Sequence, residues 1–462
     1  MHRLETVSRY GFWAVLALAP LPLGSNRDWA WSPLAVVVGL LLVARAAAAW
    51  RGDDGAPALD PRRLWLPIAC LLVVSAWALA QTVAWTPSGW HSGLYGAAGE
   101  ALGAAPAGRV SIDPELTQAA LMRLLTYAGM FWLALGVCRD PADARRTLRV
   151  AVAAAAGYAL YGLLNEFATG SRFALWYERP FAHVRRLSAV FINADNYATY
   201  AGLGFTAALA GFLPRLLGRL DEASSRRLAV RAALDHAIGA GAPWLFAATL
   251  TFGTLLMTGS RAGLAATVVA AFVVVAGALA IRRQSRTTAV AVSVAVLATV
   301  ALCLALVGDR LFAALDAAYL ETAFEARARL YREASAALAA APWTGWGFGT
   351  YIHVFPLFQG VDQPIPFEKA HSVHLENAID LGVPMAVVLT LMVAAPVLRC
   401  VHGAWTRRRD QHFALLAVAA GVLTGLHAVV DFGLQIPGIA VVFAALLGMG
   451  VAQSWSSRLT EA

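Results

Sequence analysis

The feature that most constrains this chain is its succession of long apolar segments. A bilayer core about 30 Å thick is crossed by roughly 20 helical residues. A scan with that length finds segments near 10–24, 30–50, 65–85, 116–138, 147–168, 189–212, 242–258, 262–281, 288–308, 373–400, 411–431 and 434–454. The sequence therefore predicts an all-α polytopic membrane protein with about twelve transmembrane helices. The first and seventh segments are short, so we expect a count between roughly eleven and fourteen.

Composition agrees with this class. Of the 462 residues 59% are apolar and 14% are charged, whereas soluble domains carry about 25% charged residues. In a soluble protein the net charge of +8 would suggest a nucleic-acid partner, but here it bears on orientation in the bilayer, and no nucleic acid is expected. The N-terminal stretch resembles a signal peptide without an A-x-A-like cleavage site, and we interpret it as an uncleaved first helix.

The arginines predict the orientation. With a cytoplasmic N-terminus, every inside connection carries at least one arginine, and the inside connections hold roughly twice as many basic residues as the outside ones. We therefore expect both termini in the cytoplasm. The outside arginines are not scattered, because most lie in 172–186, in 310–332 or in the turn TGSRAG (258–263). This clustering indicates an anion-binding function outside.

The connections divide the chain into three parts. Residues 1–308 carry the first nine segments with basic cytoplasmic loops, residues 309–371 form one large external loop, and residues 372–462 carry the last three segments. Within the external loop, 321–340 has helical periodicity and ends before Pro342. The GWGFG cluster that follows lacks a phosphate-binding pattern and predicts a tight turn. Residues 86–115, rich in Gly, Ala and Pro, predict an external loop with a re-entrant or interfacial course.

A polar cluster stands where the external loop meets the tenth segment, in EKAHSVHLENAIDLG (368–382). Ionisable groups at membrane depth are costly and indicate function. The outer compartment lacks ATP and nucleotide sugars, so the anion that we expect there is a lipid phosphate or diphosphate. Arginine binds such groups in pairs and stays charged, and cations at a departing diphosphate stabilise a transition state. A sugar hydroxyl that attacks such a substrate needs a base, and His371 is the candidate.

Alternatives stay open for several of these residues. His371 is alternatively a polar residue at a helix start, and His374, one turn further on, is alternatively the base or its hydrogen-bonding partner. Glu376 and Asp380 enter the apolar segment and need partners. The remaining arginines are alternatively lipid-head-group contacts or solvated helix charges: Arg185, Arg186, Arg329 and Arg332.

Two further arginines carry open questions. Arg261 is alternatively an interfacial residue whose charge snorkels to water. Arg123 lies about two turns into the fourth segment and needs an acidic or phosphate partner, for which Asp195 and Glu166 are both candidates.

Six stretches in this order resemble the O-antigen ligase and polysaccharide polymerase superfamily of bacterial membrane glycosyltransferases. They are PLPLGSNRDWAW (20–31), LSAVFINADNYATYAGLG (187–204), LMTGSRAG (256–263), EARARLYREASAALAAAPWTGWGFGTY (325–351), KAHSVHLENAIDLGVP (369–384) and VVDFGLQIPGIA (429–440). Each is weak alone, but the ordered set spans nearly the whole chain. The sequence departs from the family pattern at Ser372, His374, Ala189 and Tyr331, which stand where Asn, an aromatic residue, Gly and Trp are common.

The resemblance implies a GT-C-like membrane enzyme of the bacterial inner membrane with a periplasmic active site. It implies a metal-independent, inverting transfer without a cofactor, from a glycan on undecaprenyl diphosphate to an acceptor hydroxyl, with His371 as catalytic base. The sequence itself shows no external D-x-D or histidine cluster with metal-ligand spacing. The diphosphate-binding residues would be Arg261, Arg327, Arg186, Arg185 and Arg179. The supporting residues would be His374, Glu376, Asn196, Arg123 and Tyr331.

The acceptor distinguishes the members of this superfamily. A second lipid-linked glycan makes a polymerase, lipid A core makes a ligase, and a protein hydroxyl makes a protein O-oligosaccharyltransferase. The F-x-N-x-x-N-Y-A-T-Y and V-D-F segments favour a polymerase of exopolysaccharide or O-antigen. The rival class is a transporter or flippase of lipid-linked sugars. Transporters tend to show paired halves with sites at the midplane, whereas here no repeat is found and the ionisable groups gather near the external face.

Overall fold

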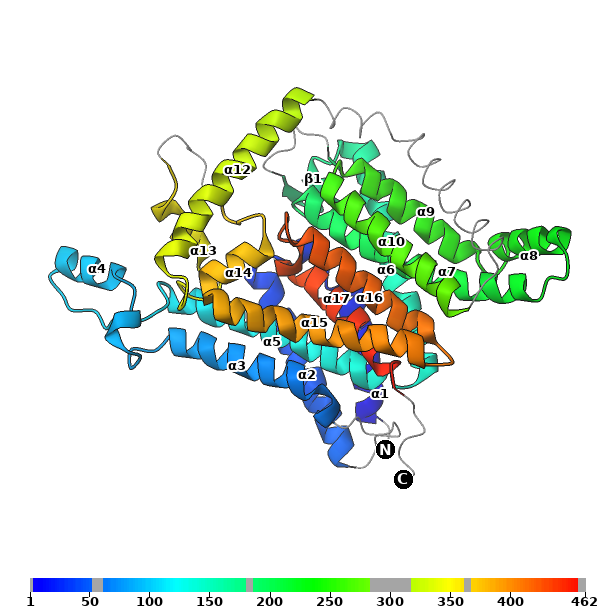
Figure 1. Cartoon of the computed structure of the whole chain (residues 1–462), viewed down its shortest axis with the longest axis horizontal. Helices are drawn as coiled ribbons and strands as arrows, with labels where there is room; N and C mark the ends of the chain where they lie inside the picture. Colours follow the sequence, from blue (N-terminus) through cyan, green and yellow to red (C-terminus); the bar gives the residue numbers. More distant parts are fainter. Residues whose placement is uncertain (1–2, 52–60, 180–185, 283–316, 361–366, 456–462) are drawn as a thin grey trace.

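The structure is a computed structural model that describes residues 3–51, 61–179, 186–282, 317–360 and 367–455. The longer helices are α1 (Arg3–Leu18), α2 (Asp28–Trp50), α3 (Trp65–Gln81), α5 (Pro114–Val137), α6 (Pro141–Thr169), α7 (Ala194–Asp221), α8 (Arg226–Ile238), α9 (Ala242–Met257), α10 (Arg261–Ile281), α12 (Ala317–Ala340), α15 (Val383–Thr406), α16 (Gln411–His427) and α17 (Pro437–Ala452). The short elements are η1 (Leu23–Ser25), η2 (Pro61–Leu64), η3 (Ser88–Trp90), α4 (Leu94–Leu102), β1 (Phe173–Ala174), β2 (Tyr177–Glu178), α13 (Tyr351–Val354), η4 (Phe355–Leu357), α14 (Val373–Leu381) and η5 (Gly433–Gln435). Figure 1 shows most of the long helices gathered into one bundle, from which α12 and α4 project.

The described part of the chain confirms an all-α polytopic membrane protein. Seven of its helices are long and apolar enough to cross a bilayer, or up to eight if α8 and α9, which meet at 73°, form one broken span. The predicted segments fall on helices, except that 288–308 lies outside the described residues. Helices α1, α16 and α17 have only 16 to 17 residues, so the count of twelve stays a prediction. The only strands described are β1 and β2, a hairpin of two-residue strands that pairs Phe173 with Glu178.

The predicted continuous span at 373–400 is wrong, because the structure breaks it into α14 and α15 at Gly382. Gly382 has φ +79°, which favours glycine. The backbone of the preceding loop packs directly on this break, since Val383 N donates to Pro342 O (2.8 Å) and a Cβ on Gly382 would collide with the Trp343 carbonyl. Hydropathy could not show the break, because the loop that causes it lies some 40 residues earlier in the sequence.

The GWGFG cluster forms the tight turn that was predicted. Gly345, Gly347 and Gly349 all have positive φ, and the turn lies against α14. Gly347 N donates to Asp380 O (3.0 Å) and Gly349 N donates to Asp380 Oδ2 (2.8 Å). The turn therefore fixes the end of the short helix that follows the polar cluster.

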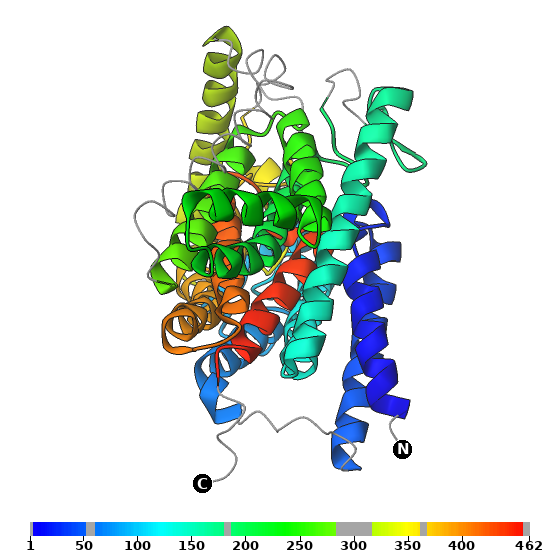
Figure 2. The same ribbon diagram turned by 90° about the vertical axis from the view of Figure 1, so that its right-hand side faces the viewer.

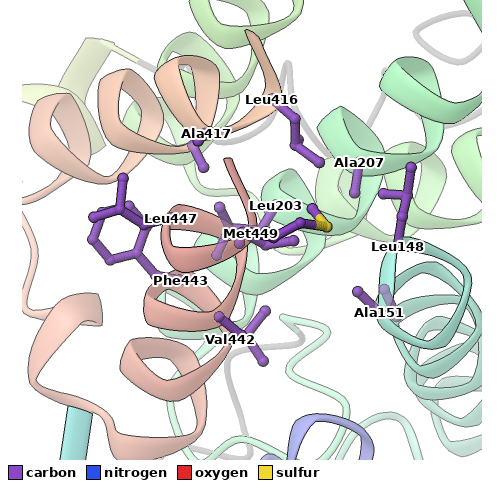
Figure 3. Packing of buried hydrophobic residues seen from close by; sticks show 14 of the residues in the cluster. Leu148, Ala151, Leu203, Ala207, Leu416, Ala417, Val442, Phe443, Leu447 and Met449 are labelled. Carbon is purple, nitrogen blue, oxygen red and sulfur yellow. The ribbon is translucent and has the colours of Figure 1, made fainter. Parts of the chain in front are cut away.

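Helix α17 is the centre of the bundle. Every residue of α17 is buried, which is expected of a helix that is apolar all round. Its neighbours approach closely at glycines, since a Cβ on Gly448 would lie 2.5 Å from the Phe131 carbonyl of α5 and one on Gly450 would collide with Ala417 of α16. Figure 3 shows side chains of α6, α7, α16 and α17 meeting in this core. Small residues at such crossings are typical of membrane helix packing.

The connections separate into two groups at opposite ends of the bundle. At one end Arg9 pairs with Asp143 (3.2 Å), and Gln453 Nε2 donates to Cys138 O (2.6 Å). These residues come from or border connections assigned to the inside. Figure 2 shows the start of α1 at this end and α12 at the other. The candidate site lies among the connections assigned to the outside.

Candidate active site

His371 lies in the turn that leads into α14. Its backbone is left-handed, with φ +50°. A histidine is several-fold more tolerant of this region than most residues, and a backbone outlier of this kind often marks a functional site. Ser372 caps α14 by accepting a hydrogen bond from Leu375 N (3.4 Å). Tyr331 of α12 donates its hydroxyl hydrogen to the His371 carbonyl (3.1 Å), so the backbone conformation is held from outside the turn.

The His371 ring is packed between two aromatic rings. Phe432 stands edge-on at 5.1 Å and Phe367 at 6.4 Å between ring centroids. Burial lowers the pKa of His371 below its usual value, and Arg327 lowers it further, while Asp195 and Glu376 oppose the shift. At neutral pH the imidazole is therefore uncharged, which is the form that accepts a proton.

Glu376 holds the residues just before His371. Its side chain is buried, and Oε1 pairs with Lys369 Nζ (3.0 Å) while Oε2 accepts from Ala370 N (3.0 Å). The beginning of α14 is also tied to the loop after α16, since Val373 N donates to Ala428 O (2.9 Å). Glu376 thus has the partners that its burial requires, and it positions the turn.

Arg186 connects two other predicted segments. Its guanidinium pairs with Asp195 at the start of α7 (2.7 Å) and donates to the Thr258 carbonyl (2.7 Å). Ser260 also acts on Asp195 by a side-chain hydrogen bond. Because Asp195 acts on His371 in turn, the Arg186 pair, the turn at 258–261 and the histidine belong to one electrostatic neighbourhood.

Among the predicted diphosphate-binding arginines, Arg261 and Arg327 are the two whose charge is available to a ligand. Arg261 is the first residue of α10, which Ser260 caps by accepting from Gly263 N (3.3 Å). A helix start attracts anions through its free N–H groups and dipole, so Arg261 adds a charge where an anion is already favoured. Arg327 is exposed on α12. Among the described residues neither side chain has a carboxylate partner.

Sequence reasoning missed three residues of the site, which are Thr199, His427 and Asp431. His427 Nδ1 lies 2.7 Å from the Thr199 hydroxyl, and Asp431, also buried, accepts from Gly433 N (2.9 Å). Burial, with a smaller contribution from Asp195, raises the pKa of Asp431 to about 7. The available signal was an ionisable pair four residues apart at the end of an apolar segment, His427 and Asp431.

Arg179 and His374, which were also predicted as site residues, lie in other surroundings. Arg179 donates to three main-chain carbonyls, those of Ser171, Arg186 and Ile192, at 2.8 to 3.1 Å, so it braces the loop that carries Arg186. His374 is exposed on α14.

Three more predicted residues make no described contact with His371: Asn196, Arg185 and Arg123. Asn196 is buried, and its Oδ1 has no hydrogen-bond partner in the described part of the chain. Arg185 lies outside the described residues. Arg123 pairs with neither expected carboxylate, because Asp195 pairs with Arg186 and Glu166 accepts from Ser171 (2.6 Å). The Arg123 guanidinium instead lies 5.6 Å from the centre of the Trp31 ring.

The stretches that carry the family resemblance converge here. The second and third meet where Leu187 N donates to Met257 O (3.1 Å). The first packs on the second and the last, because a Cβ on Gly24 would lie 2.7 Å from the Phe191 ring and 3.0 Å from Ile436. The fourth and fifth meet at Tyr331 and His371, as described above. Segments far apart in sequence thus build a single site.

Comparison with known proteins gives one result for this region. Residues 246–390 match the family model described as O-antigen ligase. The matched region runs from α9 into α15 and includes Arg261, Arg327, Tyr331 and His371. It confirms the family resemblance that the motifs predicted. No curated protein matches the chain.

Proposed function

We propose that this chain, whose residues 246–390 match the O-antigen ligase family, is an inverting, metal-independent glycosyltransferase. It moves a glycan from undecaprenyl diphosphate to an acceptor hydroxyl at the periplasmic face of the bacterial inner membrane. The family match supports an O-antigen ligase or polymerase type of membrane enzyme. The donor and the inversion are what the family resemblance implies, and the sidedness rests on the distribution of the arginines.

In the proposed reaction the acceptor oxygen forms a bond to the anomeric carbon of the donor glycan. The bond from that carbon to the diphosphate oxygen breaks on the opposite side, and the diphosphate leaves with the electron pair. The proton of the acceptor hydroxyl goes to the uncharged His371 ring. Arg261 and Arg327 offset the charge that develops on the leaving diphosphate. Arg186, which pairs with Asp195 and donates to the Thr258 carbonyl, fixes the backbone on this side of the site.

The observation that carries the proposal is the environment of His371. Its ring packs against Phe432 and lies in the field of Arg327, which keeps it uncharged at neutral pH. Arg261 and Arg327 have no carboxylate partner among the described residues; Arg261 follows Ser260, which hydrogen-bonds Asp195, and Arg327 acts on His371 directly. A base beside unpartnered guanidinium groups fits a hydroxyl attack that expels a phosphate.

The acceptor that we propose is a second lipid-linked glycan, which makes the protein a polymerase of exopolysaccharide or O-antigen. Lipid A core as acceptor would make it a ligase, and a protein hydroxyl would make it an O-oligosaccharyltransferase. The ionisable groups around His371 lie among the connections at one end of the bundle rather than halfway along the helices, and this supports a transferase over a transporter.

The base and the diphosphate site are tested by separate substitutions. His371→Ala should reduce transfer by at least a hundredfold with the fold intact, because general-base catalysis contributes about 10²–10⁴. Normal product from that variant would end the base assignment. Arg261→Ala should raise the KM for the donor, whereas Arg332→Ala on the exposed face of α12 should not. Unchanged donor kinetics in the Arg261 variant would make the turn purely structural.

The acceptor is tested with purified protein and an undecaprenyl-diphosphate oligosaccharide, with and without lipid A core. Polymerase activity gives a ladder of longer lipid-linked glycans without lipid A core. A product that appears only with lipid A core identifies a ligase. Movement of the intact donor across a vesicle membrane, without any new glycosidic bond, would contradict a transferase.

A further inference from the structure

A second site lies against α14, apart from the arginines assigned to the donor. A cavity of about 270 Å³, open on one side, is lined by residues of α3, α5, α14, α15 and α17. On α5 its lining runs from Ala120 to Trp132, which is about 18 Å along a helix axis. Most of the lining is apolar, including Phe443 and Leu447. An elongated apolar cavity of this kind matches the shape of a hydrocarbon chain.

The lining of the cavity also includes polar groups that are incompletely satisfied. Tyr127 Oη, Asp380 Oδ1 and Gln435 Oε1 all belong to lining residues, and within the described structure each of these buried atoms lacks a hydrogen-bond partner. Asp380 is only 2% exposed. Buried polar groups are normally paired, so three orphaned atoms around one cavity indicate a ligand with hydrogen-bond donors, such as hydroxyl groups.

Two cations also belong to the lining, beside the carboxylates of Glu376 and Asp380, and one of the two has no carboxylate partner among the described residues. Arg123 lines the cavity, and its contacts in the described chain are the Trp31 ring and its own helix, where Nε donates to Ala119 O at 3.4 Å. Lys369, paired with Glu376, lines the cavity as well. The matching ligand is therefore an amphiphile with an apolar chain and a head that is anionic and hydroxyl-bearing.

The proposed donor cations do not line this cavity: Arg186, Arg261 and Arg327. It nevertheless borders the His371 turn. Glu376 lines the cavity and holds Ala370, and Leu434 lies two residues beyond Phe432, which contacts the His371 ring. In an inverting displacement the nucleophile approaches from the side opposite to the leaving group. Because none of the three arginines lines the cavity, an acceptor anchored there would reach the His371 turn without displacing the donor diphosphate.

We propose that this cavity binds the lipid anchor of the acceptor, an amphiphile with an anionic, hydroxyl-bearing head. The assignment rests on the proposed function, since it gives that reaction two lipid sites that share the His371 turn. The two sources of such an anchor, a lipid-linked glycan and lipid A core, share this chemistry and are separated by experiment.

The first test counts bound lipids. The full chain in neutral phosphatidylcholine nanodiscs is incubated with undecaprenyl-diphosphate oligosaccharide or lipid A core, and the complexes are weighed by native mass spectrometry. For a lipid-linked acceptor, wild type should bind two molecules, Ala444→Phe should bind one, and Ala444→Phe with Arg261→Ala should bind none. Val43→Phe, on an exposed position of α2, is the matched control and should bind two. Two molecules bound to Ala444→Phe would overturn the proposal.

The second test separates ligand binding from folding. Tyr127→Phe and Gln435→Leu each remove an orphaned polar atom, so without ligand their Tm should equal or exceed that of wild type. The Tm increase caused by the acceptor lipid should fall by at least half. A lower Tm without ligand and an unchanged increase would make these atoms structural and refute the proposal. An equal increase with phosphatidylglycerol would show a site for bulk lipid and would also refute it.

These outcomes distinguish the cavity assignment from the proposed reaction. If no lipid-linked substrate is ever transferred but Ala444→Phe still loses one bound lipid, the reaction fails, and the cavity remains a lipid site without an acceptor role. If transfer proceeds and the cavity variants keep both the bound lipids and the KM for the acceptor, the cavity assignment fails alone.

Discussion

At the scale of single residues, the protonation of His371 is set by its surroundings and is therefore measurable. Burial and Arg327 both lower its pKa, so the base form persists to a lower pH than in a free histidine. We predict that the rate of transfer falls on the acid side with a midpoint below about 6.5. Arg327→Gln should raise that midpoint, and Arg329→Gln on the same helix should leave it unchanged. A midpoint that ignores Arg327 would contradict the assignment of His371 as the titrating base.

Asp431 gives a prediction about stability. Its folded pKa of about 7 lies above the unfolded value of about 3.9. A raised folded pKa means that the folded state binds the proton more tightly, so this contribution is fully present below about pH 4 and is lost as the pH rises to 7. Wild-type Tm should therefore fall between pH 5 and 8.5, and Asp431→Asn should reduce that fall. Asp235→Asn, an exposed position on α8, is the control. An equal fall in both variants would contradict the prediction.

At the scale of elements, the close approach of α17 to α5 is testable through glycine. A Cβ on Gly448 would meet the backbone of Phe131 at 2.5 Å, so Gly448→Ala must separate the helices and lose packing. A Cβ on Gly157 of α6 would have no atom within 4 Å, and Gly157→Ala gains helix propensity of up to about 1 kcal/mol. We predict opposite shifts in Tm for these two identical substitutions. Equal shifts would mean that the contact at Gly448 has no energetic weight.

The elements show what sequence could and could not predict. Apolar length located the helices, because a bilayer imposes that length locally. The pairing of Arg186 with Asp195, nine residues further on, was not predicted, because the course of the loop between them sets it. The break at Gly382 was not predicted either, because it depends on a segment some 40 residues earlier in the sequence. For the same reason the orphaned atoms around the cavity had no signal in the sequence: Tyr127 and Gln435 resemble ordinary helix residues until α5, α14 and α17 are packed together.

The candidate site, too, has features that the sequence predicted and features that it did not. The structure brings His371, Tyr331 and Arg327, which the motifs singled out, into one neighbourhood. The arginine cluster at 172–186 gave no indication that main-chain carbonyls accept the hydrogen bonds of Arg179. Ala189, which stands where the family commonly has Gly, has φ +48°, so the common Gly has a physical reason in this turn. Pattern thus identified the region, while the role of each side chain required its partners.

At the scale of the whole molecule, the two groups of connections lie at opposite ends, and only their assignment to compartments is untested. Ser88 and Ser224 are exposed and belong to connections assigned to the outside and the inside. Cys70, Cys138 and Cys400 are buried and free, so a background with Cys303→Ser suits labelling by an impermeant maleimide. We predict that Ser88→Cys is labelled in intact spheroplasts and that Ser224→Cys is labelled only after permeabilisation. The reverse result would put His371 in the cytoplasm and contradict transfer at the periplasmic face.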